Sequence, residues 1–401
     1  MPQIGEAMNA KPYGTGADTR AGRIRRRAWA IAQPLIHRLL RSKYRFEYLP
    51  IGIEGPFLLI ANHANNDDPL LVSMSSKKTP LTFVASEHLG RLGPVTGLLT
   101  RYFSVILRKK AASAVGTVRD ILKALRQGES VVLFAEGDCT WDGISAKIFP
   151  ATGKLAKAAG VPLVTYRLEG NYLSCPRWAK RPRKGRCRGS VVRIYPPEAL
   201  AAMDPEEITA AIDRDIHVDA WELQRRDKAR YQAASPAVGL ERALFLCPDC
   251  GKAGTLRTKG RSIFCAACGM QAALDDRGFF CSGPYPDIPA WDRWQRSALA
   301  AMVDEGRQRE LFPGKGRLTE LPCRRGRRIR FSLDLARRAI VTDSEAVPFG
   351  EISEMAMVKT NRLLFSTRKG YFELKTKRGI LRPYLTAWQV CRRNIDETEE
   401  T

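Results

Sequence analysis

The segment LLIANHANNDDPL, residues 58–70, joins an apolar strand to a cluster of reactive side chains. Its apolar run ends at Ala61, His63 follows almost at once, and Asp68 lies five residues further on. Histidine is the side chain best suited to take a proton near neutral pH, and a carboxylate beside its other ring nitrogen fixes the tautomer. Proteins of the α/β class place reactive groups where a strand runs into a loop. We therefore predict that His63 and Asp68 are catalytic.

The same residues also allow a purely structural interpretation. Asp68 followed by Pro69 is a good helix start, with aspartate as the N-cap and proline at the first helical position. A single histidine at the end of a strand is usually a satisfied surface or core residue. The rest of the sequence has to decide between the two interpretations.

Short apolar runs alternate with helical stretches between residues 51 and 235. This alternation predicts an α/β layer fold with a mixed, largely parallel sheet. The expected strands are Phe57–Ala61, Leu81–Ala85, Val131–Phe134, Val161–Tyr166 and Val191–Tyr195, and the expected helices are Ala114–Arg126 and Gly153–Ala159.

Four motifs in this region resemble, in order and spacing, the blocks of the glycerolipid acyltransferase superfamily, which contains the 1-acyl-sn-glycerol-3-phosphate acyltransferases. Asn62-His63-x4-Asp68 resembles the H-x4-D box, and Phe103–Arg108 resembles the second block, which ends in a basic residue. Phe134–Thr140 resembles the third block, F-P-E-G-T-R-S, and Gly160–Val164 resembles the fourth. The resemblance covers roughly residues 21–235.

The resemblance implies direct acyl transfer without a covalent acyl-enzyme. His63, oriented by Asp68, would deprotonate an acceptor hydroxyl, which would attack the thioester of acyl-CoA or an acyl carrier protein. Arg108, Glu136 and Gly137 match acceptor-binding positions, with Arg108 pairing with a phosphate. The implied acceptor is a lysophospholipid, first of all 1-acyl-sn-glycerol-3-phosphate, and the implied process is phospholipid biosynthesis.

Two departures from the third block put a phosphate-bearing acceptor in doubt. Cys139 stands where the family normally has arginine, and Asp138 stands where it has threonine. An acyltransferase with a non-phosphate lipid acceptor is therefore a second hypothesis. No G-x-S-x-G nucleophile elbow is present, and no histidine stands beside Cys139 in the sequence, so we expect Cys139 to be a passive small residue.

Two C-x-x-C pairs predict a metal site. Cys247 and Cys250 are separated by fourteen residues from Cys265 and Cys268. Two such pairs complete a tetrahedral site of four sulfurs, and a site with no open position stabilises the fold and does not catalyse. We therefore predict structural zinc in a zinc ribbon. Residues 153–178 also resemble a bacterial branch of the superfamily that carries a zinc ribbon and a further C-terminal domain.

The 66 Lys and Arg residues exceed the 42 Asp and Glu residues, which gives a net charge of +24 and points to a polyanionic partner. Residues 21–45 form a basic amphipathic pattern that suits an anionic membrane surface, although a helix packed on the domain with solvated arginines is an equal alternative. The run 177–193 carries eight Lys and Arg residues and no acid, so it either meets an anionic ligand or is a solvated loop.

No apolar run is long enough to span a bilayer, and no signal peptide is visible, so we expect a protein of the cytoplasm, peripheral on the cytoplasmic face of the cell membrane. A nucleic-acid-binding zinc protein is the alternative from another class. We regard nucleic acid as an unlikely partner, because that alternative leaves His63, Asp68, Glu136 and Gly137 unexplained.

Changes in composition and periodicity divide the chain into successive units. A small sheet closed by one helix, with period-two strands, resembles a pleckstrin-homology (PH) fold. The predicted units are a flexible tail (1–20), a basic amphipathic helix (21–50), the acyltransferase domain (51–235), the zinc ribbon (245–283), a helical linker (284–315) and a PH-like β-rich domain (316–395).

Overall fold

The computed structural model describes residues 20–76, 81–86, 105–108, 115–306, 308–321 and 326–399. The predicted flexible tail lies outside these residues except for Arg20, and so does Phe103 at the start of the second family block. None of the helices in the described part of the chain is long and apolar enough to cross a membrane.

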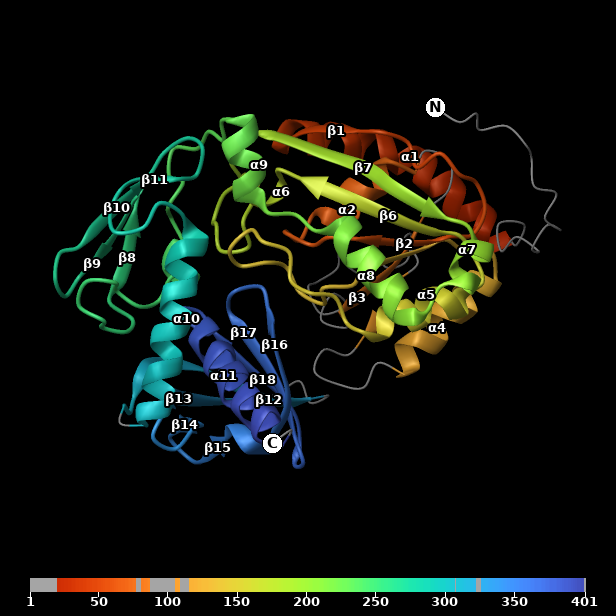
Figure 1. The fold of residues 1–401 in the computed structure, drawn as a ribbon. Coiled ribbons are helices and arrows are strands. Elements are labelled where there is room, and N and C mark those ends of the chain that lie inside the picture. The colour runs from red at the N-terminus through yellow and green to blue at the C-terminus, as the bar shows by residue number, and fades with distance from the viewer. Residues whose placement is uncertain are drawn as a thin grey trace.

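Within the described residues, a seven-stranded sheet forms the centre of the N-terminal half (Figure 1). The strand order is β1-β7-β6-β2-β5-β3-β4, and neighbouring strands are parallel except for β6 and β7. This sheet confirms the predicted α/β fold with a mixed, largely parallel sheet. The strands are β1 (Arg45–Tyr48), β2 (Leu58–Ala61), β3 (Thr82–Ser86), β4 (Val105–Arg108), β5 (Val131–Phe134), β6 (Leu163–Glu169) and β7 (Arg186–Tyr195).

Helices cover both faces of this sheet. One face packs against α1 and α2 through residues such as Trp29 and Leu71, and the other packs against α4, α5 and α8 through residues such as Ile121 and Ile208. All four residues of β2 are fully buried, which explains its uninterrupted apolar sequence. The helices are α1 (Arg20–Lys43), α2 (Asp68–Met74), α4 (Val115–Arg126), α5 (Ala151–Ala159), α6 (Asn171–Ser174), α7 (Pro197–Ala202), α8 (Pro205–Ile216) and α9 (Ala220–Asp227).

Two antiparallel sheets follow along the chain. The first has the order β11-β10-β9-β8, and the second has the order β15-β14-β13-β12-β18-β17-β16 and is closed by the C-terminal helix α11. The expected β-rich C-terminal unit is therefore confirmed. The strands are β8 (Leu256–Lys259), β9 (Ser262–Cys265), β10 (Gln271–Leu274), β11 (Phe280–Ser282), β12 (Leu311–Leu321), β13 (Arg327–Asp334), β14 (Ala339–Thr342), β15 (Ala346–Pro348), β16 (Ile352–Val358), β17 (Arg362–Thr367) and β18 (Gly370–Thr376), and α11 is Arg382–Glu399.

The predicted linker contains α10 (Ile288–Glu305), which lies between the two antiparallel sheets (Figure 1). This helix is a core element and not an exposed spacer, because Trp291 is completely buried. One hydrophobic cluster runs from Trp221 of α9 through Ile263 and Trp291 to Phe331 of the C-terminal sheet. The successive units of the chain therefore share a continuous core.

Candidate active site

His63 and Asp68 lie where β2 ends and α2 begins. Because β2 is parallel to β5 and β6, the carboxyl ends of these three strands meet at one edge of the sheet. Nδ1 of His63 is 2.9 Å from Oδ2 of Asp68. The His63 ring also stacks on Phe134, the last residue of β5, with ring centroids 4.4 Å apart. The fold thus brings the two predicted catalytic residues into direct contact.

The carboxylate of Asp68 is fully buried and held from several sides. Its Oδ2 also accepts the N–H groups of Ala64 at 2.7 Å and Asn65 at 2.9 Å. Its Oδ1 accepts a hydrogen bond from Nδ2 of Asn171 at 2.9 Å. The N-cap of α2 is Asp67 and not Asp68, which corrects the structural interpretation: Asp68 is the first helical residue, and its carboxylate turns back towards the loop of His63. These bonds fix the position of the carboxylate beside the imidazole.

Asn171 is a site residue that the sequence motifs do not reveal. It follows β6, the neighbour of β2, and the chain turns there at Gly170, which has φ +75°. A Cβ on Gly170 would lie 2.1 Å from the carbonyl oxygen of Arg186, so only glycine fits. A glycine–asparagine pair at the end of the strand that adjoins β2 is the signal that would have found this residue.

Glu136 connects the backbone of the two loops at this edge. Its Oε1 accepts the N–H of His63 at 2.7 Å, and its Oε2 accepts the N–H of Ala146 at 2.8 Å. Burial raises the pKa of Glu136 to about 7, because the charged form loses its water. Binding of acceptor hydroxyls by Glu136 stays a prediction. In the structure, its carboxylate positions the backbone of His63.

Cys139 lies on the other side of the His63 ring. Its Sγ is 3.3 Å from Nε2 of His63, although 76 residues separate the two in sequence. The loop is fixed at this point, because the N–H of Thr140 donates to the carbonyl oxygen of His63 at 3.0 Å. The reason for treating Cys139 as passive was the absence of a neighbouring histidine, and that reason does not hold in three dimensions.

The pKa of His63 is set by its neighbours. Burial disfavours the protonated form, but Cys139 and Asp68 outweigh this effect and raise the pKa of His63 well above its ordinary value. His63 therefore retains its second ring proton to a higher pH than a free imidazole does, and it acts as a base in the form that has lost this proton.

Gly137 and Arg108 meet at the ring of Phe149. Gly137 has φ +77°, and a Cβ there would lie 2.6 Å from the Phe149 ring, so only glycine fits. The guanidinium of Arg108 lies over the same ring, 5.2 Å from its centroid. Nε of Arg108 is buried and has no hydrogen-bond partner among the described residues. A cationic N–H in this situation can receive an anionic group.

Asp138, the carboxylate that the third block adds, is compensated within the protein. Its Oδ2 is 2.8 Å from Nη1 of Arg177, which also donates to the carbonyl oxygen of Cys139 at 2.7 Å. The Arg177 guanidinium stacks over Trp141, 4.1 Å from the ring centroid, and donates to the carbonyl oxygen of Lys359 at 2.9 Å. The added negative charge is therefore neutralised next to the site.

The basic run 177–193 does not form one ligand-binding surface. Besides Arg177, Arg183 is almost fully buried and donates to the carbonyl oxygen of Pro236 at 2.8 Å. Arg186 is exposed and pairs with Glu47 at 2.9 Å. Part of the run is therefore structural, which neither of the two sequence-based interpretations anticipates.

Residues 41–169 match the acyltransferase family model. This segment is an acyltransferase domain. It contains five of the predicted site residues, and Asn171 follows it directly. The five are His63, Asp68, Arg108, Glu136 and Gly137.

Among solved structures, the chain is similar to the crystal structure of the 1-acyl-sn-glycerophosphate acyltransferase PlsC from Thermotoga maritima. The sequence identity is 17%, the TM-score is 0.41, and the match covers 50% of this chain and 84% of that chain. A search of curated protein sequences gives no match.

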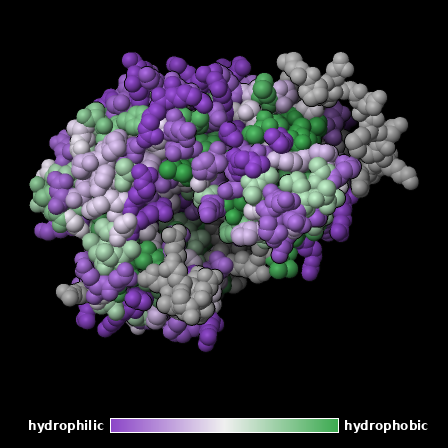
Figure 2. All heavy atoms as spheres, in the orientation of Figure 1, coloured by the Kyte–Doolittle hydropathy of each residue, from purple (hydrophilic) through white to green (hydrophobic). Residues whose placement is uncertain are grey.

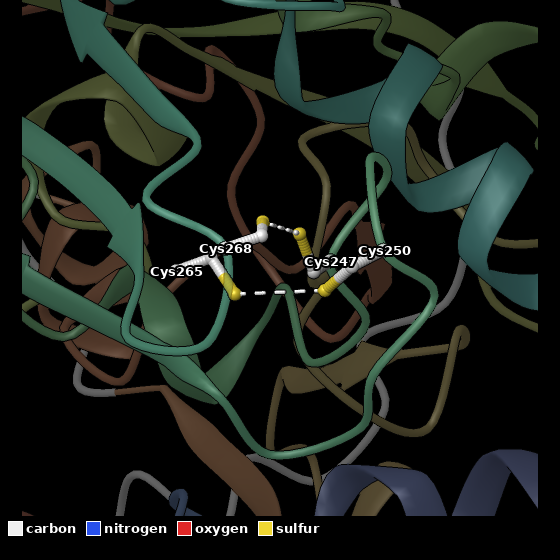
Figure 3. Close-up of side chains that lie close together, drawn as sticks. All are labelled: Cys247, Cys250, Cys265 and Cys268. Atoms are coloured by element: carbon white, nitrogen blue, oxygen red, sulfur yellow. Dashed lines mark hydrogen bonds between the residues drawn. The ribbon is translucent and has the colours of Figure 1, made fainter.

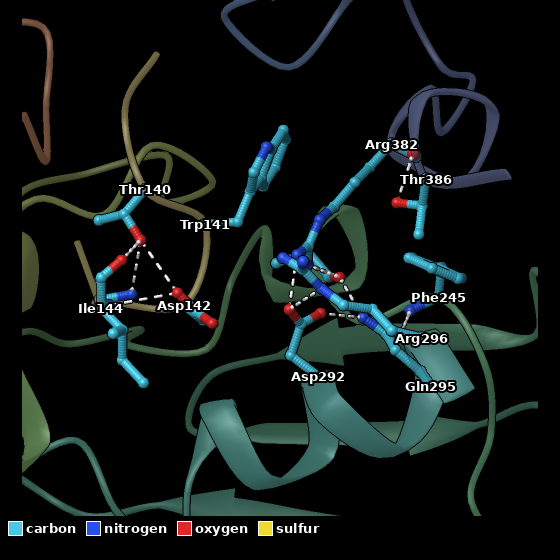
Figure 4. A network of polar contacts seen from close by, with 12 residues as sticks. Thr140, Trp141, Asp142, Ile144, Phe245, Asp292, Gln295, Arg296, Arg382 and Thr386 are labelled. Carbon is cyan, nitrogen blue, oxygen red and sulfur yellow. Dashed lines mark hydrogen bonds and ion pairs between the residues drawn. The ribbon is translucent and has the colours of Figure 1, made fainter. Parts of the chain in front are cut away.

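The C-terminal helix contacts the acyltransferase domain next to this site (Figure 4). The guanidinium of Arg382 lies 4.9 Å from the ring centroid of Trp141 and pairs with Asp292 of α10 at 2.7 Å. Within the loop, the Thr140 hydroxyl donates to the carbonyl oxygen of Ile144 at 2.7 Å. The loop that carries Cys139 is thus held both by its own hydrogen bonds and by α10 and α11.

The four cysteines of the two C-x-x-C pairs converge on one point (Figure 3). Their Sγ atoms all lie within 4.8 Å of one another, with 3.6 Å between Cys247 and Cys268 and 3.8 Å between Cys250 and Cys265. Four thiolates bound to zinc at about 2.3 Å in a tetrahedron are separated by about 3.8 Å. The cluster can therefore hold one metal ion through four sulfur ligands.

Proposed function

We propose that the protein transfers a fatty acyl group from an acyl thioester, acyl-CoA or acyl carrier protein, to the hydroxyl of a lysophospholipid in phospholipid biosynthesis. The observation that carries this proposal is the contact of His63 with Asp68 inside an acyltransferase domain. Asp68 keeps a proton on Nδ1, which leaves Nε2 to take the proton of a hydroxyl. Overall, one ester bond forms and the thiol of the donor is released.

The surroundings of the site support 1-acyl-sn-glycerol-3-phosphate as the preferred acceptor. Arg108 offers a buried N–H without a partner among the described residues. Arg177 neutralises Asp138, so the negative charge of Asp138 does not repel a phosphate. The competing acceptor, an uncharged lipid alcohol, is favoured by Cys139 standing where the family has arginine.

An acceptor panel tests this proposal. With palmitoyl-CoA as donor, we expect thiol release with lysophosphatidic acid at a kcat/KM at least about tenfold above that with monoacylglycerol. Charge-assisted hydrogen bonds contribute about 1.5–3 kcal/mol, so Arg108→Ala should raise the KM for lysophosphatidic acid by about 10- to 100-fold.

Two controls make this result specific. Arg108→Ala should leave the KM for monoacylglycerol unchanged, and Arg119→Ala, an exposed arginine of α4, should behave as wild type. Equal use of the two acceptors by the wild type would contradict the phosphate acceptor. No thiol release with any acceptor would contradict acyl transfer itself.

We further propose that α1 attaches the protein to an anionic membrane surface. Its inner face packs on the domain through Trp29 and Leu40, but Ile31, Leu35 and Leu39 are 79%, 63% and 62% exposed. Hydrophobic side chains gather on the surface over α1, surrounded by hydrophilic ones (Figure 2). Spacing of four residues places this stripe on one side of the helix, where aliphatic side chains can enter the headgroup region. The exposed Arg38 and Arg41 beside it suit anionic headgroups.

Replacing Ile31, Leu35 and Leu39 together by glutamine should weaken binding to phosphatidylglycerol vesicles by at least about tenfold. Burial of an aliphatic side chain contributes about 1.5–3 kcal/mol when complete, so even shallow insertion of three exceeds the 1.4 kcal/mol that corresponds to tenfold. Vesicle co-sedimentation measures the effect. The double variant Val192→Gln/Ile194→Gln, which removes two partly exposed apolar residues of β7, is the control and should bind as wild type. Unchanged binding of the triple variant would rule out α1 as the attachment site.

We assign zinc to the four-cysteine cluster, because four thiolates in a tetrahedral arrangement are typical of structural zinc. Two of the ligand residues, Cys247 and Cys265, belong to the buried core of the ribbon. The ion would join the two loops of the ribbon and leave no position open for substrate. Its role is to stabilise the fold.

A further inference from the structure

We infer that Cys139 is a nucleophile that carries the acyl group as a thioester between donor and acceptor. The inference rests on the proposed acyl transfer and deepens its mechanism. It is carried by the His63 ring, whose Nε2 is 3.3 Å from Sγ of Cys139 while its Nδ1 is 2.9 Å from Oδ2 of Asp68. Sites of covalent acyl transfer combine a nucleophile, a base beside it and a third group that orients the base. Cys139, His63 and Asp68 are arranged in this way.

The position of the thiol is fixed by the residues on both sides of it. The carbonyl oxygen of Cys139 accepts a hydrogen bond from Arg177 at 2.7 Å, and the next N–H, that of Thr140, donates to the carbonyl oxygen of His63 at 3.0 Å. Cys139 itself is only 7% exposed. The turn after β5 at Gly137, with φ +77°, brings the thiol to the carboxyl-end edge of the sheet. A reactive group held on a short, anchored turn needs little reorganisation before it reacts.

The thiol also occupies the position beside Nε2 of His63 that the acceptor hydroxyl needs in direct transfer. In direct transfer, the acceptor hydroxyl must contact Nε2 of His63, but Sγ of Cys139 already lies there. Once the sulfur carries an acyl group it has no proton to donate, and Nε2 is free for the acceptor hydroxyl. The Cys139 thiol therefore reacts first, with the acyl donor, and the acceptor hydroxyl reacts second, with the acylated thiol.

The two half-reactions balance. Nε2 of His63 takes the Sγ proton, the Cys139 thiolate attacks the thioester carbonyl, and the C–S bond to the donor breaks. The donor thiol leaves with the proton from His63, and the acyl group remains on Cys139. In the second half, His63 takes the proton of the acceptor hydroxyl, and the oxygen attacks the Cys139 thioester. The C–S bond to Cys139 breaks, and its sulfur recovers the proton from His63.

Intact-mass measurement of the full-length protein tests this inference. Incubation with palmitoyl-CoA without acceptor, followed by acid quench, should add one palmitoyl group. Peptide mapping should place the group on Cys139, and neutral hydroxylamine should remove it. The control is Cys281→Ala, which removes an exposed cysteine of β11 and should be acylated as wild type.

Kinetics of two Cys139 variants complete the test. Cys139→Ala should lose at least about 10³-fold of the transfer to lysophosphatidic acid, with an unchanged melting temperature. Cys139→Ser, which exchanges only sulfur for oxygen, should also lose activity. Initial rates of the wild type at varied donor and acceptor should give the parallel lines of a ping-pong reaction.

The outcomes separate this inference from the proposed function. Transfer by Cys139→Ala within about tenfold of wild type, or a wild type that never gains the acyl group at Cys139, overturns the nucleophile and leaves acyl transfer intact. Acylation of Cys139 without transfer to any lysophospholipid supports the nucleophile and overturns the acceptor. A wild type that releases no thiol and gains no acyl group overturns both.

Discussion

Replacing His63 by alanine is expected to lower acyl transfer by about 10⁴-fold while the protein remains folded. The imidazole lies between the buried carboxylate of Asp68 and the thiol of Cys139, so its removal leaves no group at Nε2 to accept or return a proton. Asp68 keeps its hydrogen bonds from Ala64, Asn65 and Asn171, so its buried charge is not left without partners. Initial rates with palmitoyl-CoA and lysophosphatidic acid, together with a thermal melt, measure the two effects.

The pH dependence of the wild type gives an independent check of the same role. The base form of His63 increases as pH rises, and its pKa is raised well above 6.5, so kcat/KM should rise with pH along a limb centred above that value. The groups that face His63 are Asp68 and Cys139, and Glu136 contacts its backbone N–H. An acid limb below pH 6.5 would contradict this role.

An exposed histidine provides the matched control for the substitution. His217 lies at the C-terminal end of α8, on the surface. His217→Ala should retain full acyl transfer and the wild-type pH profile. Activity of His63→Ala within about tenfold of that of His217→Ala would exclude His63 as the base.

The sequence allowed the His63–Asp68 pair to be predicted because both residues lie on one turn between β2 and α2, five positions apart. Their other partners come from strands that neighbour β2 in space but not in sequence. Asn171 follows β6, and Cys139 follows β5. The order β6-β2-β5 depends on how all the strands pair, and no local pattern of apolar residues reveals it. The fold class was therefore predictable, but the full set of contacts around His63 was not.

Charge was the least predictable property, because compensation of a charge depends on tertiary contacts. Asp138 put a phosphate-bearing acceptor in doubt, yet Arg177, 39 residues away, pairs with it. Acceptor binding by Glu136 stays a prediction, but the sequence did not show that both of its oxygens accept backbone N–H groups. In each case the sequence showed the charged group but not the partner that burial requires.

The net charge of +24 is distributed over several separate places. Arg183 and Arg382 are buried, and the exposed Arg38 and Arg41 flank the apolar stripe of α1. Others line one groove of the C-terminal sheet, where β12 and β13 place like charges opposite each other at Lys315–Arg330 and Arg317–Arg328. Like charges directly across a strand pair repel, so this groove suits an anionic partner. A protein that reads nucleic acid with one surface would gather these charges together, and the acyltransferase interpretation does not require that.

Loss of the metal from the four-cysteine cluster is expected to unfold the ribbon and lower the free energy of unfolding by about 4 kcal/mol or more. Structural zinc binds with about 10–16 kcal/mol in zinc-finger peptides, so much of the ribbon's stability would come from the ion. Cys268→Ser is the cleanest variant, because this ligand is exposed and its replacement leaves no cavity. The melting temperature should fall by about 10 °C, and bound zinc, measured by atomic emission, should be lost.

The same loss should also lower acyl transfer, because the ribbon is packed against the residues that support Asp68. Phe279 of the ribbon contacts Trp221 with ring centroids 5.5 Å apart, and Trp221 contacts Tyr172 at 6.2 Å. Tyr172 directly follows Asn171, whose side chain donates to Asp68. An unfolded ribbon would expose this aromatic cluster and release the turn that holds Asn171.

Chelation should therefore reduce activity and stability together, and added zinc should restore both. Cys281→Ser, on the neighbouring β11 but outside the cluster, should retain zinc, stability and activity. A zinc-free protein that melts at the wild-type temperature would show that the ribbon core holds without the ion.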